Sequence, residues 1–190
     1  MPSRSSTRWR SAALILSAVL VVGIVRYGRA PSAAIQPSSA QRIVCDIRFS
    51  PHGGCTDAIV GTLREAKQTV LMQAYSFTSE PIANALIAAK RRGASVKVIL
   101  DKSQLAERYS VAGQLMASGI LVRIDYAHAI AHNKVIVIDG RTVLTGSFNF
   151  TRGAEERNAE NLLILRDANV AVQYAENWRA HWGHSQPYVQ

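Results

Sequence analysis

The sequence predicts an α/β fold in which a mixed, largely parallel β-sheet is flanked by helices. Strand-like and helix-like patterns alternate through residues 42–125, and a β-hairpin signal, a further apolar strand and a closing helix follow in residues 132–182. Alternating strands and helices build a parallel sheet with right-handed crossovers. The 190 residues, 48% of them hydrophobic, provide enough core for one domain, which we place at residues 41–190.

The first part of this domain contains four strands and three helices. Residues 42–49 alternate apolar and polar side chains, which is typical of a strand with one buried face. Apolar runs predict further strands at 69–75, 95–101 and 121–125. Apolar residues at helical spacing predict the intervening helices at 57–67, 79–92 and 103–118.

A hairpin is predicted between two β-like runs, at 135–138 and 142–145. The dipeptide Asp139-Gly140, which joins them, is a strong signal for a tight turn. A last buried strand at 161–166 and a helix at 167–182 complete the domain.

Four polar side chains flank this hairpin. His132 and Lys134 are two residues apart, so they lie on the same face of an extended strand. The hairpin carries Ser147 and Asn149 back toward the level of His132 and Lys134. An imidazole, an ammonium, a hydroxyl and an amide would then converge, and such a set suits a phosphate group.

The net charge of +9 comes largely from the N-terminal segment. Five arginines and no acidic residue lie in residues 1–34, and the rest of the chain carries 17 basic and 13 acidic side chains. Basic residues followed by an apolar run, here residues 11–25, are typical of a secretory signal, and the run is short for a membrane span. We expect residues 1–34 to be a signal peptide or, less favoured, an N-terminal membrane anchor. A linker at 35–40 and an exported domain, periplasmic or secreted, would follow.

Two cysteines, Cys45 and Cys55, flank a turn-like sequence at residues 50–54. A disulfide between them suits an oxidising compartment, and two small buried thiols are the alternative. His52 lies between the cysteines, but a zinc site formed by these three residues would lack a fourth ligand. We therefore expect no metal and no other cofactor.

One motif in the chain resembles a known family signature. His132-x-Lys134-x4-Asp139, followed by Gly146-Ser147-x-Asn149, is similar to the signature of the phospholipase D superfamily. The likeness spans nearly the whole exported domain. Three segments particularly resemble the small, single-motif bacterial endonucleases of that superfamily: FSPHGGCTDAIV, QAYSFTSEPIANAL and AHNKVIVIDG. The resemblance implies a phospholipase D-like nuclease fold, metal-independent hydrolysis and a homodimer, because members with one motif copy act as homodimers.

Phosphodiester chemistry also points to a dimer. The nucleophile and the leaving group lie on opposite sides of phosphorus, so one His132 cannot serve both, and a two-fold dimer supplies the second copy. The resemblance implies that one His132 forms a phosphohistidine while its partner copy protonates the leaving oxygen and then activates water. Lys134 and Asn149 would hold the non-bridging oxygens, with Ser147 as a supporting donor. Glu160 matches the acidic residue that single-motif nucleases use to orient the imidazole.

Other polar residues receive structural interpretations. Asp139 belongs to the motif, but its place in a tight turn favours a structural role over a catalytic one. Glu155 and Glu156 are interpreted as solvated loop charges, and His128 as a loop histidine.

The leading functional prediction is a non-specific endonuclease that binds the backbone of DNA or RNA. The alternative is a phospholipase D that hydrolyses phospholipid head groups, held at a membrane if residues 11–25 remain as an anchor. A catalytically inactive binding protein is the third hypothesis, and the complete motif disfavours it.

Overall fold

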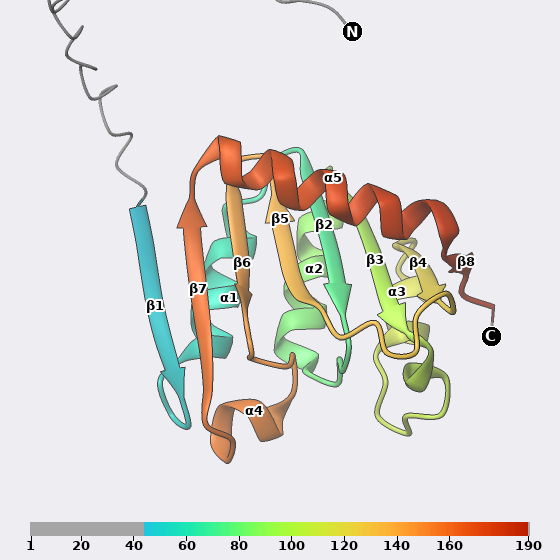
Figure 1. Ribbon diagram of the computed structural model, residues 1–190, viewed down its shortest axis with the longest axis horizontal. Coiled ribbons are helices and arrows are strands. Elements are labelled where there is room, and N and C mark those ends of the chain that lie inside the picture. Colours follow the sequence, from blue (N-terminus) through green and yellow to red (C-terminus); the bar gives the residue numbers. More distant parts are fainter. Residues whose placement is uncertain (1–43, 190) are drawn as a thin grey trace, which may run out of the picture. The chain divides into compact units, whose positions relative to one another are not determined.

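The computed structural model describes residues 44–189, in which a mixed eight-stranded sheet lies between two layers of helices (Figure 1). The strand order is β1-β7-β6-β5-β2-β3-β4-β8. The strands are β1 (Val44–Ser50), β2 (Thr69–Ala74), β3 (Ser95–Asp101), β4 (Leu121–Asp125), β5 (Lys134–Ile138), β6 (Thr142–Gly146), β7 (Glu160–Arg166) and β8 (Gln186–Pro187). The helices are α1 (Cys55–Arg64), α2 (Glu80–Arg91), α3 (Ala112–Ala117), α4 (Arg152–Glu156) and α5 (Ala168–His184), with a 3-10 turn at Lys102–Leu105.

The predicted mixed sheet with flanking helices is confirmed, although its parallel part is smaller than expected. Parallel pairing is confined to β2, β3 and β4. The crossovers through α2 and α3 return the chain to the start of the next strand, as parallel pairing requires. The later strands pair antiparallel because a hairpin joins β5 to β6, and β7 and β1 then add antiparallel at the edge.

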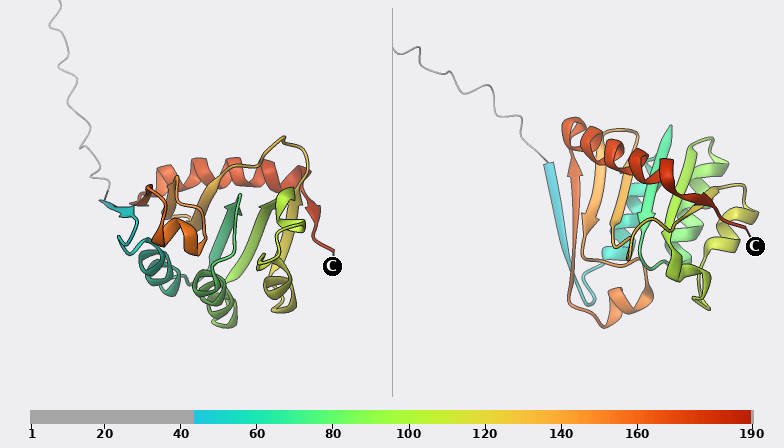
Figure 2. Two further views of the ribbon diagram at one scale, coloured as in Figure 1. Left: turned by 90° about the horizontal axis from the view of Figure 1, so that it is seen from below. Right: turned by 45° about the vertical axis from the view of Figure 1, so that its right-hand side comes forward.

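The sheet separates two apolar cores. In Figure 2, α1, α2 and α3 lie against one face and α5 crosses the other. The larger core joins the first three helices to the sheet, and the smaller one packs Ala171 and Ala175 of α5 against Val135, Val137 and Val143. Trp178 is buried beneath α5, where its indole N–H donates to the carbonyl of Met72 at 2.8 Å. This hydrogen bond gives a partner to the indole N–H, the one polar group of a side chain that is otherwise apolar.

The edge strand β1 differs from its prediction. Its residues from Val44 to Phe49 are exposed, and only Ser50 is buried. The expected buried face, with Cys45, Ile47 and Phe49, is therefore wrong in this structure. Its apolar residues pair in register with β7, but α5 lies over the central strands of that face and leaves this edge open (Figure 1).

The disulfide hypothesis is also wrong for this structure. Cys45 is exposed on β1, whereas Cys55 is buried at the start of α1, and both are free thiols. The strand continues to Ser50, so the turn occupies only the residues that follow it. Five residues of extended chain carry Cys45 about 17 Å from that turn.

The expected signal peptide or anchor at 1–34 and the linker at 35–40 lie outside the described residues, as do the first two residues of the predicted strand at 42–49. Within residues 44–189, no helix is long and apolar enough to span a membrane.

Candidate active site

A pocket lies where β5 and β7 begin and β6 ends; Figure 1 shows that these strand ends lie at the same end of the sheet. The structure brings together here five of the residues selected from the sequence, with Gly146 and Asn161 beside them. The lining residues are His132, Lys134, Gly146, Ser147, Asn149, Glu160 and Asn161. The predicted convergence around the hairpin is therefore present in a single chain.

His132 and Lys134 form one wall of the pocket. His132 is exposed, while Lys134 is 94% buried, and its Nζ donates to the His132 carbonyl at 2.7 Å. Both side chains lie against Tyr75: its ring centroid is 4.6 Å from that of the imidazole and 5.1 Å from Nζ. Burial lowers the pKa of Lys134, and the negative charge of Glu160 partly offsets that effect. An ammonium group with few partners is thus held beside an accessible imidazole.

Ser147 and Asn149 form the opposite wall. The Ser147 hydroxyl oxygen accepts hydrogen bonds from the Asn161 backbone N–H at 3.1 Å and from its side-chain amide at 3.2 Å. A hydroxyl has two acceptor lone pairs and one hydrogen, so the hydrogen of Ser147 is left to donate into the pocket. The Oδ1 atom of Asn149 is buried without a hydrogen-bond partner. An amide edge at the pocket wall therefore has unused bonding capacity.

Gly146 allows the end of β6 to approach the start of β7. Its φ is +142°, and a Cβ at this position would lie 2.3 Å from the carbonyl oxygen of Asn161. A larger residue would push β6 away from the start of β7, and Ser147 with it. Glycine is required here for both conformation and space.

Glu160 lies in the pocket, as predicted, but its contacts differ from the expected ones. Among the described residues, its carboxylate accepts one hydrogen bond, from the Asn158 side chain at 3.2 Å, and none from His132. Its charge acts on Lys134. Glu160 is thus placed to influence the ammonium directly, and its orienting role toward His132 stays a prediction.

Asp139 lies at the far end of β5 from the pocket. Its carboxylate accepts the backbone N–H groups of Lys67, Gln68 and Thr69 at 2.8–2.9 Å. Burial raises its pKa, but these three donors outweigh that effect and hold the pKa below its usual value. Asp139 and Gly140 have φ values of +51° and +61°, as a type I′ hairpin turn requires. Asp139 therefore joins the hairpin turn to the start of β2, which agrees with the structural role favoured from the sequence.

Glu155 is not a solvated loop charge, and that interpretation was wrong. Its carboxylate accepts the backbone N–H of Gly54 at 3.0 Å and that of Thr56 at 2.7 Å, so it caps the N-terminus of α1. A capping residue 99 positions from Thr56 leaves no local signal in the sequence. Glu156 pairs with Arg152 on the surface.

A second polar cluster lies outside the pocket and was missed. Asp125, His128, His181 and His184 come together between the end of β4 and the end of α5. The interpretation of His128 as a loop histidine was therefore incomplete, because its ring contacts the buried carboxylate of Asp125. Two local signals were available: Asp125 and His128 are three residues apart, and so are His181 and His184.

Comparisons with known proteins agree with this geometry. Residues 59–182 match the family model described as "Cardiolipin synthase, PLD-like domain". A phospholipase D of Rickettsia typhi is 46% identical over 130 residues, which are 68% of this chain and 64% of that relative. A mitochondrial cardiolipin hydrolase of Xenopus laevis is 30% identical over 157 residues, 83% of this chain and 75% of the relative.

A solved structure of a related protein has the same fold. Nuc from Salmonella typhimurium, a phospholipase D family member, superposes with a TM-score of 0.74 at 36% identity and covers 78% of this chain and 100% of its own. The matched family region contains the whole hairpin, from His132 to Asn149, and Glu160 as well. The chain therefore belongs to the phospholipase D superfamily.

Proposed function

We propose that this protein is a phosphodiesterase that forms a phosphohistidine at His132 and acts on a nucleic-acid backbone. The observation that carries the proposal is the convergence of His132, Lys134, Ser147 and Asn149 on one open pocket. These groups supply a nucleophile and the donors that stabilise charge on phosphoryl oxygens.

Each pocket residue receives a role from its contacts. His132 is exposed, so its ring can reach a phosphorus atom in the pocket. Lys134 is held beside it by the hydrogen bond to the His132 carbonyl, and its remaining donors face the phosphoryl oxygens. Asn149 and Ser147 line the same pocket, where the side-chain NH2 of the amide and the free hydrogen of the hydroxyl add neutral donors. Together they stabilise the charge that builds as the phosphoryl group transfers.

The reaction requires a second histidine that one chain does not provide. Within residues 44–189, His132 is the one histidine that lines the pocket. While it attacks phosphorus, an acid must protonate the leaving oxygen from the opposite side, and the same acid must later activate water as a base. His132 of the partner subunit fills both roles in a two-fold dimer. The functional unit we propose is therefore a homodimer with one active site at its axis.

The exposed face of β1 supports this dimer. Ile47 and Phe49 have 52% and 66% of their surface exposed and lie on the same side of the strand. Phe49 pairs in register with Asn161, and Ser50 pairs with Glu160, so this apolar strip borders the pocket. We assign a second copy of the chain to the strip, since such a contact covers exposed apolar surface next to the site.

Nucleic acid is the substrate that the pocket favours. Among the described residues, its lining consists of polar side chains and one glycine, and the apolar strip of β1 beside it is the surface that we assign to the second copy of the chain. Recognition would rest on the phosphate backbone, so we expect activity to fall as salt rises. Activity on DNA that is unchanged from low to high salt would contradict backbone binding.

Phospholipid is the second candidate. It is favoured by the names of two relatives, the phospholipase D of Rickettsia typhi and the mitochondrial cardiolipin hydrolase of Xenopus laevis. Both chemistries break a phosphodiester and require the same histidine. The two candidates differ in what must contact the substrate beyond its phosphate.

A side-by-side assay separates the two candidates. Plasmid DNA, single-stranded RNA, phosphatidylcholine vesicles and cardiolipin vesicles are incubated with the full chain, and with His132→Ala as control. We expect cleavage of nucleic acid by the wild type alone. Lipid hydrolysis without nucleic-acid cleavage would assign the phospholipase function, and loss of neither activity in His132→Ala would overturn the mechanism. A wild type that cleaves none of these substrates would favour the inactive binding protein.

A further inference from the structure

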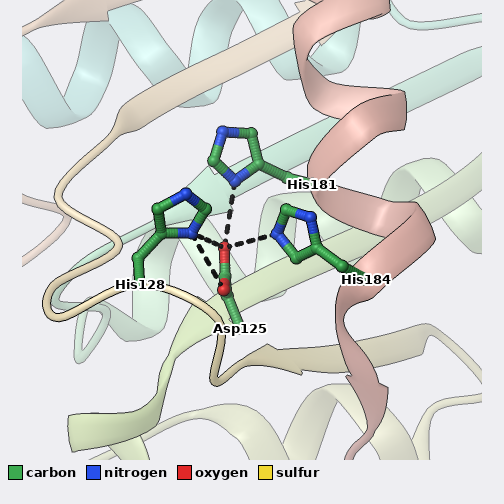
Figure 3. Close-up of side chains that lie close together, drawn as sticks. All are labelled: Asp125, His128, His181 and His184. Carbon is green, nitrogen blue, oxygen red and sulfur yellow. Dashed lines mark hydrogen bonds and ion pairs between the residues drawn. The ribbon is translucent and has the colours of Figure 1, made fainter.

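Three imidazoles converge on one buried carboxylate at the C-terminal end of α5 (Figure 3). The Oδ2 atom of Asp125 lies 3.0 Å from His128 Nδ1, 3.0 Å from His181 Nδ1 and 3.2 Å from His184 Nε2. A carboxylate oxygen has two lone pairs. His128 Nδ1 also lies 3.2 Å from Oδ1, so three ring nitrogens surround this one buried carboxylate group.

We propose that Asp125, His128, His181 and His184 form a structural site for a divalent transition metal, with Zn²⁺ as the fitting ion. The four candidate ligand atoms all lie within 4.8 Å of one another. In a tetrahedral zinc site with bonds of about 2.0–2.1 Å, neighbouring ligand atoms are about 3.3 Å apart. The three oxygen–nitrogen distances of 3.0–3.2 Å are close to that spacing.

The donor set is chemically suited to zinc. Imidazole nitrogens and a carboxylate oxygen are among its usual ligands, and four protein ligands are typical of structural sites, which leave no position for substrate.

Contacts outside the pocket hold these four ligands in place. His181 and His184 are three residues apart on α5, so they project from one face of the helix. Between them, Trp182 stacks on Trp178 with ring centroids 4.9 Å apart, which fixes the last turn of α5. The backbone N–H of Ala127 donates to Asp125 Oδ1 at 3.0 Å and orients the carboxylate. Such supporting hydrogen bonds are typical of metal sites.

An ion at this site would connect two parts of the chain. His128 lies in the segment between β4 and β5, the same segment that ends in His132 and Lys134. The metal would connect this segment to the end of α5. His181 on that helix is 53 residues after His128 in the sequence. Its role would be to stabilise the fold on the side of the sheet that leads into the pocket. Entry is open, because the side chains of His128 and His184 are 45% and 37% exposed.

Metal binding to the full, tag-free chain tests the proposal without any substrate, so its outcome is independent of the proposed enzymatic activity. After treatment with a chelator, the protein is titrated with Zn²⁺ against a chromophoric chelator, and with Co²⁺ while the visible spectrum is recorded. We expect one ion per chain, a Co²⁺ spectrum of the intense four-coordinate type, and a higher melting temperature with Zn²⁺.

Single-site variants locate the ion. His128→Ala and His184→Ala each remove one exposed ligand and leave buried Asp125 in place, so both are expected to fold. We expect each to weaken Zn²⁺ binding by about 100-fold or more and to abolish the Zn²⁺-dependent rise in melting temperature. His52→Asn and His132→Ala, which remove histidines outside the cluster, should bind one Zn²⁺ as the wild type does.

Two results would overturn the site. One is a wild-type chain that takes up no stoichiometric Zn²⁺ or Co²⁺. The other is binding of equal affinity in the wild type, His128→Ala and His184→Ala, which would place the ion elsewhere.

Discussion

The pocket around His132 and the cluster around Asp125 use histidine in opposite ways. The segment between β4 and β5 contributes His132 to the pocket and His128 to the cluster. In the pocket, His132 is exposed, and no hydrogen bond to its ring is present among the described residues. In the cluster, His128, His181 and His184 all contact the fully buried carboxylate of Asp125. The first arrangement leaves an imidazole free to react, while the second uses every imidazole to hold a position. The same side chain therefore serves chemistry or structure according to what its nitrogens contact.

The largest expected effect separates the two groups by activity. His132→Ala removes the nucleophile, so we expect phosphodiester cleavage to fall by about 10⁴-fold or more, with the melting temperature unchanged. His52→Asn, which removes an exposed histidine outside both groups, is the matched control and should keep wild-type activity. Rate measurements on the substrate identified by the side-by-side assay check this. Comparable rates in His132→Ala and His52→Asn would remove the basis for placing the chemistry in the pocket.

The next largest effect is expected from a change that disrupts the proposed dimer. Phe49→Lys places a charge in the apolar strip of β1, so we expect it to shift the chain from dimer to monomer and to lower activity by at least about 100-fold. Leu121→Lys is the control, because Leu121 is 58% exposed on β4, which is six places from β1 in the strand order of the sheet. Sedimentation velocity and rate measurements are made on both. A monomeric Phe49→Lys with full activity would show that one chain completes the site.

Replacement of Lys134 tests the charge on the pocket wall. Lys134→Met keeps a long side chain but removes the ammonium, so we expect kcat to fall by about 10²–10³-fold. Asn149→Ala, which removes a neutral donor, should have a smaller effect on the same rate. A Lys134→Met variant that changes KM alone would mean that the ammonium binds the substrate and the transition state equally.

Glu160 is expected to alter the pH profile more than the maximal rate. Its negative charge raises the pKa of Lys134, so Glu160→Gln should lower that pKa further. Lys134 then loses its proton at lower pH, and the alkaline limb of the kcat/KM profile should move to lower pH. A Glu160→Gln profile that overlays the wild type would show that Glu160 does not act on the pocket charge.

The smallest effect on activity is expected at Asp139, which belongs to the motif but not to the pocket. Asp139→Ala removes three backbone hydrogen bonds and leaves alanine in the left-handed region, so we expect a loss of about 1–3 kcal/mol in the free energy of unfolding. Asp139→Asn tolerates that conformation and keeps one acceptor oxygen, and should lose less. Both should retain the wild-type kcat, measured with substrate in excess.

The contribution of Asp139 also has a pH signature. Its folded pKa is below its usual value, so the ionised form stabilises the fold fully above about pH 4 and loses that contribution as pH falls through the folded pKa. The difference in unfolding free energy between the wild type and Asp139→Ala should therefore shrink below about pH 4. A difference that is constant down to pH 2 would mean that the carboxylate charge plays no part.

Local patterns predicted most of the elements and the pocket. The hairpin follows from Asp139-Gly140 between two apolar runs, because a tight turn brings its two strands into antiparallel pairing. The observed register pairs Val135 near the start of β5 with Thr145 near the end of β6. Ser147 and Asn149, which follow β6, therefore come close to Lys134, the first residue of β5, and to His132 shortly before it. The site could be predicted because its residues belong to one local supersecondary unit.

The features that were not predicted from the sequence depend on contacts between residues that are far apart in the chain. Burial of the apolar side of β1 depends on how far α5 extends over the sheet, and periodicity carries no such information. Glu155 caps a helix that begins 100 residues earlier, and the cluster around Asp125 needs β4 and α5 to meet. Such long-range contacts are set by the topology of the sheet, which local patterns constrain only weakly.

The central claim is that two copies of His132 act on one phosphate, and mixed dimers test it most directly. Wild-type and His132→Ala chains are coexpressed in equal amounts with random pairing, and the specific activity of the mixture is compared with that of the wild type. If both copies are needed, only wild-type dimers are active, and we expect about a quarter of the wild-type activity. An activity of about half would mean that each chain has an independent site, and would contradict the shared active site.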